Sequence, residues 1–132
     1  MAINFDKALG VHPYALQVRA ERAQILAGNL ANVDTPGYLA RDIDYKQILG
    51  EVASRVASGN QSTDQSTDSS TLASLDLQEP LYRVPFQTSA DGNTAELGVE
   101  QAKFGNNSMD FQTSLTFLNM KINGLAKAIE GR

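Results

Sequence analysis

The side chains that could do chemistry in this sequence are few and scattered. His12 is the one histidine in 132 residues and stands beside Pro13, with no second histidine to form a metal site or a catalytic pair. The sequence has no cysteine, which excludes thiolate zinc sites, iron–sulfur clusters and cysteine nucleophiles. We therefore interpret His12 as a surface residue.

Two aspartates, Asp42 and Asp44, stand in alternate positions of a segment that we expect to be extended. Their carboxylates would then point to the same side and could bind a metal ion or do acid–base work. Because two carboxylates without further ligands are common on solvated strand faces, we interpret the pair as structural.

The remaining candidate motifs are incomplete. The glycines lack the spacing of a phosphate-binding loop, and no serine stands in the G-x-S-x-G setting of a hydrolase. The stretch Asp91-Gly92-Asn93 lacks the distal ligands of an EF-hand, so we expect a turn there. The sequence thus predicts no catalytic residue, no cofactor and no metal ion, and the protein is not expected to be an enzyme.

Composition narrows the classes of partner. Fifteen acidic against eleven basic residues give a net charge of -4, which predicts no binding to nucleic acid and no direct binding to lipid. The absence of tryptophan and an aromatic content of 7% predict a thin core, and the length predicts a single domain, residues 1–132. Residues 1–10 lack the basic start and apolar run of a secretory signal peptide.

A long helix is predicted near the N-terminus, within residues 1–35. Residues 14–33 are rich in strong helix formers, and Pro13 stands where a first turn tolerates proline. One face of this helix carries mostly small side chains at alternating spacings of four and three. This alanine stripe consists of Leu16, Ala20, Ala23, Ala27 and Leu30.

The region 36–92 is expected to be irregular. Pro36-Gly37 is the favoured central pair of a type II turn and should end the first helix. After the turn we expect an extended segment at 39–45, a short helix around Ile48, Val52 and Val56, and an edge strand at 81–86. The polar tract at about 58–71 has no burial force and is predicted to be a flexible loop.

A second long helix is predicted at 93–132. Asn93 and Glu96 have the spacing of a helix N-cap and its reciprocal acidic partner. Large apolar residues then repeat at spacings of four and three, interrupted only by Ser108. This bulky seam consists of Phe104, Phe111, Leu115, Leu118, Ile122, Leu125 and Ile129.

The two patterns are complementary, because large side chains pack well against small ones. We therefore expect a mainly α fold in which the long N- and C-terminal helices pair as a coiled-coil-like rod, with a small irregular or β segment and a flexible loop between them. So narrow a rod leaves apolar positions uncovered, which suggests self-assembly through both helices.

The end of the first helix resembles a known signature. Residues 26–38 read Leu-Ala-Gly-Asn-Leu-Ala-Asn-Val-Asp-Thr-Pro-Gly-Tyr, similar to the motif that closes the first helix of bacterial flagellar axial proteins. The residues that carry this signature turn are Ala31, Asn32, Thr35, Pro36, Gly37 and Tyr38. The short chain and the sequences at 40–45, 91–94 and 115–125 resemble the small proximal rod proteins of that family.

The resemblance implies a structural subunit of the proximal rod, in the flagellar basal body and the periplasmic space. Its implied partners are other copies of itself, other rod proteins, the adaptor FliE, the base of the MS ring and the flagellar export apparatus. Export would proceed without a cleaved signal peptide. The alternative is a soluble coiled-coil adaptor or export-associated protein that binds one partner through the same helices without polymerising.

Overall fold

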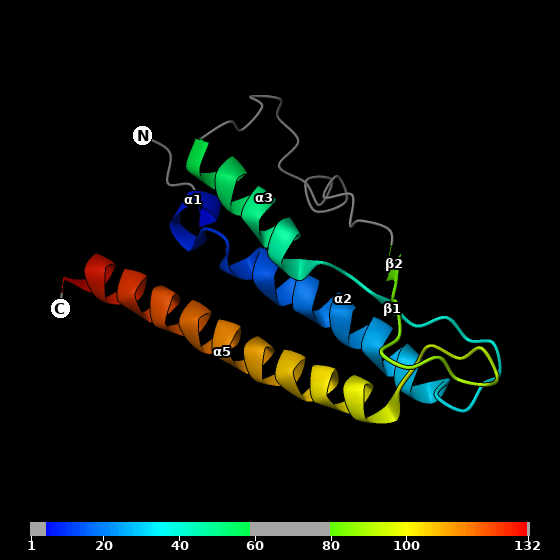
Figure 1. Ribbon diagram of the computed structural model, residues 1–132. Helices are drawn as coiled ribbons and strands as arrows, with labels where there is room; N and C mark the ends of the chain where they lie inside the picture. The colour runs from blue at the N-terminus through cyan, green and yellow to red at the C-terminus, as the bar shows by residue number, and fades with distance from the viewer. Residues whose placement is uncertain (1–4, 59–79, 132) are drawn as a thin grey trace.

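The computed structural model describes residues 5–58 and 80–131 of the chain. Nearly all of the polar tract predicted as a flexible loop therefore lies outside the described residues. Two long helices dominate the rest: α2 covers His12–Ala31 and α5 covers Leu97–Glu130. They run antiparallel, side by side, and form the largest contact between elements (Figure 1). The mainly α fold with paired terminal helices is confirmed.

The N-terminal helical region is divided. A short helix, α1 (Phe5–Leu9), is separated from α2 by a turn in which Gly10 has a φ of 63°. A positive φ is costly for residues with a side chain and stops a right-handed helix. Beyond this turn, α2 begins at His12 with Pro13 in its first turn, as the sequence predicts.

The predicted turn after α2 is confirmed. Gly37 has a φ of 72°, and the amide of Tyr38 donates to the carbonyl of Thr35 at 3.3 Å. A positive φ at the residue after proline is the geometry of a type II turn. The chain then reverses and runs back along α2 (Figure 1).

The extended segments are shorter than predicted. Strand β1 is Arg41–Asp42, and it pairs antiparallel with β2, Leu81–Tyr82, with Arg41 opposite Tyr82. The expected strand at 39–45 ends early because the Asp44 carboxylate accepts the amides of Lys46 and Gln47, both at 3.2 Å. This N-cap starts helix α3, Tyr45–Ser58, which confirms the predicted short helix.

The core of the described region is thin, as expected. Its central cluster joins Val18 of α2 to Ile43 and Ile48, and Ile25 and Tyr45 pack against it. Helix α3 therefore covers one side of α2, while α5 lies along another (Figure 1).

The predicted start of the second long helix is wrong. Helix α5 begins at Leu97 rather than near Asn93, and Glu96 at its N-cap position makes no side-chain capping bond. The Asn93 amide is instead turned toward the end of α2, and the Glu96 carboxylate accepts the amide of Phe86 at 3.0 Å. Partners distant in sequence thus outcompete the local capping pattern.

The prediction that the bulky seam packs into the alanine stripe between the helices needs correction. The α5 residues that are buried are Glu100, Asn107 and Ser114, which are all polar. At 3.6 residues per turn the seam lies roughly 40° around α5 from this buried line, so its residues are exposed or half-buried. It meets the stripe only along an open edge of the helix pair.

Candidate assembly surface

A line of polar side chains separates α2 from α5. We call Glu100, Lys103, Asn107, Asp110 and Ser114 the polar line. The Asn107 side-chain amide donates to the Arg19 carbonyl at 2.9 Å, and the Arg19 guanidinium donates to Asp110 at 2.9 Å. Sequence reasoning missed this line, although its spacings of three and four are visible in the sequence. Polar residues at that spacing are typical of a solvated helix face.

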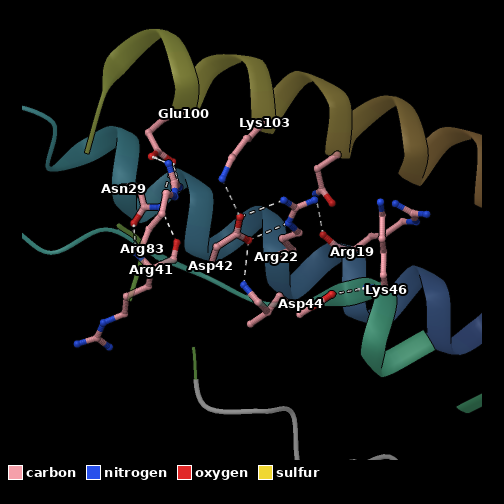
Figure 2. Close-up of polar contacts among 12 residues, drawn as sticks. Arg19, Arg22, Asn29, Arg41, Asp42, Asp44, Lys46, Arg83, Glu100 and Lys103 are labelled. Atoms are coloured by element: carbon pink, nitrogen blue, oxygen red, sulfur yellow. Dashed lines mark hydrogen bonds and ion pairs between the residues drawn. The ribbon is translucent and has the colours of Figure 1, made fainter. Parts of the chain in front are cut away.

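Asn29 lies at the centre of a buried network at the turn end of the helices (Figure 2). Its amide nitrogen donates to a Glu100 carboxylate oxygen at 3.0 Å and to the Arg41 carbonyl at 2.7 Å. Its amide oxygen accepts the Tyr38 hydroxyl and the Arg41 backbone amide, both at 3.1 Å. Every polar atom of the side chain therefore has a partner, as burial requires.

Glu100 carries a fully buried carboxylate that is held by a fork of hydrogen bonds. Both terminal nitrogens of Arg83 donate to it, and Nη2 lies 2.9 Å from Oε2. Arg83 follows β2, and its own amide donates to the Ala40 carbonyl at 2.9 Å. The pair attaches the two-stranded segment to α5 and offsets the cost of burying the charge.

A second charged cluster joins α2, β1 and α5 around Asp42 (Figure 2). Arg22 donates to both Asp42 oxygens, at 2.9 and 3.0 Å, and Lys103 approaches at 3.3 Å. Burial by itself raises the pKa of Asp42, but the hydrogen bonds and charge of Arg22 outweigh it, so the pKa lies below its ordinary value. The bond to Asp42 raises the pKa of Arg22. Asp42 therefore fastens β1 to α2 and α5 and does not lie on a solvated strand face, which was the ground of the sequence interpretation.

The signature turn is fastened to the segment that leads into α5. The Asn93 amide donates to the carbonyls of Asn32, Val33 and Thr35, at 3.0, 2.7 and 3.0 Å. These carbonyls lie just beyond the end of α2, and those of Asn32 and Thr35 also accept the backbone amides of Thr35 and Tyr38, so Asn93 binds the acceptors that shape the turn. The amide of Gly37 donates to the Asp91 carbonyl at 2.9 Å. The turn therefore connects both terminal helices.

Individual signature residues have distinct positions. Asn32 is half-buried and donates through its side chain to the Gly28 carbonyl at 2.8 Å, while the Thr35 hydroxyl donates to Asn32 at 3.1 Å. Ala31 and Pro36 are exposed. Sequence reasoning named these residues but could not foresee Asn29 and Asn93 as their supports.

The alanine stripe and the bulky seam meet in a shallow groove on one side of the helix pair. The groove is lined by Arg19, Ala20, Ala23, Phe104, Asn107, Ser108 and Phe111. Residues three, four or seven positions apart share a helix face, so the other stripe residues continue along the same face of α2 and the other seam residues along the same face of α5. The two patterns form one side-facing apolar surface.

Much of this surface has no partner within the described residues. Phe104, Leu115 and Ile122 are 38%, 42% and 46% exposed, and Ile129 is 82% exposed. The stripe residues Ala20 and Ala27 are exposed as well, whereas Leu16, Ala23 and Leu30 are half-buried. The seam residues Phe111, Leu118 and Leu125 are also half-buried. A contiguous exposed apolar patch of this kind marks an interaction surface.

No feature of the described residues suggests bound ligands. Within the described ranges, no three histidine or acidic side chains converge in a way that could hold a metal ion. His12 lies with its ring 6.3 Å from the Phe117 ring, so it packs against α5. None of the helices in the described part of the chain is long and apolar enough to cross a membrane.

Comparison with known proteins identifies close relatives over the whole chain. The flagellar basal body rod protein FlgB of Aeromonas hydrophila is 45% identical over 132 residues, covering 99% of this chain and 98% of the relative. FlgB of Salmonella typhimurium is 39% identical, covering 99% of both chains, and FlgB of Escherichia coli is 37% identical, covering 98% of both. No protein-family model matches the chain.

Proposed function

Because the chain belongs to the FlgB family of flagellar basal body rod proteins, we propose that it is a structural subunit of the proximal rod, assembling through its terminal helices into a helical tube that transmits torque. The observation that carries this proposal is the full-length similarity to proteins named as rod components. The fold agrees with it, since α5 leaves large apolar residues of its seam exposed.

The exposed seam supports assembly through the helices. In a protein that acts alone, residues such as Leu115, Ile122 and Ile129 would stay in water, and each Å² of their apolar surface left uncovered would forgo about 25 cal/mol of stabilisation. A tube of many copies would cover them. The polar line would meanwhile hold each subunit's own helix pair in register, because buried polar residues tolerate few alternative alignments.

The proposed partners are other copies of this chain, other rod proteins, the adaptor FliE, the base of the MS ring and the export apparatus. The relatives' names support association with basal body rod components in general. The proposed location is the part of the basal body in the periplasmic space, and the chain would reach it by export without a cleaved signal peptide.

A structural role also agrees with the chemistry of the described side chains. The charged groups with little exposure form ion pairs that fasten elements together: Glu100 with Arg83, Asp42 with Arg22, and Arg19 with Asp110. Of these residues only Arg19 lines the groove, which is mainly apolar. We therefore propose that the protein has no catalytic activity.

Fractionation tests the proposal against the adaptor alternative. Basal bodies purified after detergent extraction should retain the chain, detected through an epitope inserted in the polar tract at 58–71. An adaptor that binds one partner without polymerising would be washed away. Loss of the chain from the basal bodies, with intact rods remaining, would contradict the proposal.

A further inference from the structure

The C-terminal end of α5 extends beyond the helix against which it packs. Helix α2 has 20 residues and α5 has 34, and His12 at the start of α2 lies beside Phe117. We call Leu118–Glu130 the overhang; at ~1.5 Å per residue it extends for about 20 Å. In Figure 1 it is the orange and red end of α5, which passes α2 and has α1 nearby.

The overhang carries large apolar side chains that are only partly covered. Ile122 and Ile129 are 46% and 82% exposed, and they continue the bulky seam along the same face of α5. The groove farther along the helix pair offers the opposite shape, since Ala20 and Ala23 form one of its walls. Large side chains on one helix and small ones beside a groove are the complementary halves of knobs-into-holes packing.

The two ends of the helix pair also differ in charge. At the turn end, Asp34, Asp91 and Glu96 carry negative charge, and residues 32–38 and 87–96 contain no lysine or arginine. The Ser89 hydroxyl and the Asn93 backbone amide donate to the Asp91 carboxylate, at 2.5 and 3.1 Å. The overhang, at the opposite end, carries the exposed Lys121 and Lys127 against a single acidic residue, Glu130.

Both complementary halves belong to one chain, which favours a second copy as the occupant of the groove. We propose that the overhang of one copy lies in the α2–α5 groove of the next, with its basic end toward that copy's acidic turn end. This proposal rests on the proposed function and adds the direction of the contact.

Such a contact is heterologous, because a different surface is used on each copy. Heterologous contacts repeat without limit and generate rings or helical filaments, whereas a contact between identical surfaces stops at a dimer. The charges would fix the orientation more than the affinity, since exposed ion pairs contribute little to binding strength.

Engineered cysteines test the contact, because the natural sequence has none. The test variant combines Ala20→Cys in the groove with Ala126→Cys on the overhang, and both positions are exposed. Ala126 stands four residues after Ile122 and three before Ile129, so it shares their face. Along α5 it lies 15 positions beyond Phe111, roughly 22 Å away, too far for a short cross-linker to join both sites within one chain.

Basal bodies containing this double variant are treated with a short bis-maleimide. We expect a ladder of dimers, trimers and longer products, while each single variant should give dimers at most. The matched control pairs Ala126→Cys with Ala53→Cys, an exposed alanine on α3, and should give no ladder. Circular dichroism of each purified variant establishes that it folds like the natural chain.

The charge argument is tested in the same background. Lys121→Glu with Lys127→Glu should lower the ladder yield several-fold, and adding Asp34→Lys with Asp91→Lys should restore it. Basal bodies that hold the double-cysteine chain but give no ladder above the Ala53→Cys control would overturn the head-to-tail contact and leave the rod assignment standing. Absence of the natural chain from basal bodies would overturn the assignment itself.

Discussion

The Asn29 side-chain amide lies 3.0 Å from the Glu100 carboxylate, and both side chains are completely buried although they stand 71 positions apart in the sequence. This contact links the last turns of α2 to the first turn of α5. Since Asn29 also binds Tyr38 and Arg41, the register of the helix pair is coupled to the signature turn at this one side chain.

Replacement of Asn29 by aspartate should destabilise the protein strongly. Asn29→Asp removes the donor to Glu100 and sets a second carboxylate against it, so we expect the free energy of unfolding to fall by about 1 to 3 kcal/mol or more. Urea unfolding followed by circular dichroism measures the change. Gln24→Glu makes the same amide-to-carboxylate change at an exposed position of α2 and should have little effect. Equal stability of the two variants would contradict the network.

Asn93 should be needed to hold the signature turn. Asn93→Ala removes donors from three carbonyls beyond the end of α2, and we expect a loss of about 1 to 3 kcal/mol in unfolding free energy. The matched control is Asn106→Ala, at an exposed position of α5, which should change stability by less than about 0.5 kcal/mol. If Asn93→Ala loses no more stability than the control in urea unfolding, Asn93 does not hold the signature turn.

Features governed by local chemistry were predictable from the sequence. Proline followed by glycine determined the turn at Pro36-Gly37, and the spacing of Ile48, Val52 and Val56 predicted α3. The two long helices followed from composition and periodicity. Their pairing was predicted as well, but on the wrong side chains, because the buried residues of α5 are polar.

Features that depend on distant partners were not predictable in the same way. Periodicity shows that Phe104, Leu115 and Ile122 share a face, but it does not show whether this chain or another covers that face. Glu100 is buried only because Arg83 and Asn29 reach it, and neither is its neighbour in sequence. Asn93 likewise fits a local capping pattern, and its side-chain oxygen does accept the nearby Ala95 amide, yet the carbonyls to which its side chain donates stand about 60 positions away.

Glycine at position 37 should be required by the backbone. Its φ of 72° lies in the left-handed region, where a side chain costs about 1 to 2 kcal/mol, so Gly37→Ala should lower stability by about that amount. Gly105→Ala is the control: that glycine lies in α5 with open space around it, so alanine should stabilise the helix by roughly 0.5 to 1 kcal/mol. The midpoint of thermal unfolding should therefore fall in Gly37→Ala and rise in Gly105→Ala.

In cells, Gly37→Val should impair motility, and normal rods in that variant would contradict a role of the turn in assembly.

Stability should fall in acid partly through Asp42. The pKa of this carboxyl is lower in the folded protein than in the unfolded chain, where it is about 3.9. Its contribution to the free energy of unfolding is therefore complete at pH values above the unfolded pKa. As pH falls below about 3.9 toward the folded pKa, the unfolded chain takes up the proton first and the contribution is lost. Asp42→Asn should be less stable at pH 7 and less sensitive to acid than the natural chain. Asp34→Asn, an exposed carboxyl, is the control; if Asp42→Asn keeps the full acid sensitivity, the cluster with Arg22 is not its source.

Hydrogen exchange of the isolated chain should divide α5 into two parts. From Leu97 to Phe117 the helix is fastened by Glu100, Asn107 and Asp110, so opening it requires breaking buried bonds, and its amides should exchange slowly. The overhang is almost entirely exposed, with only Leu118 and Leu125 half-buried, and a helix segment with so few contacts opens readily. Its amides should exchange much faster in the isolated chain and become protected in assembled rods. Uniform protection along α5 before assembly would show that the overhang is stable without a neighbour, and would remove the reason to expect that assembly orders it.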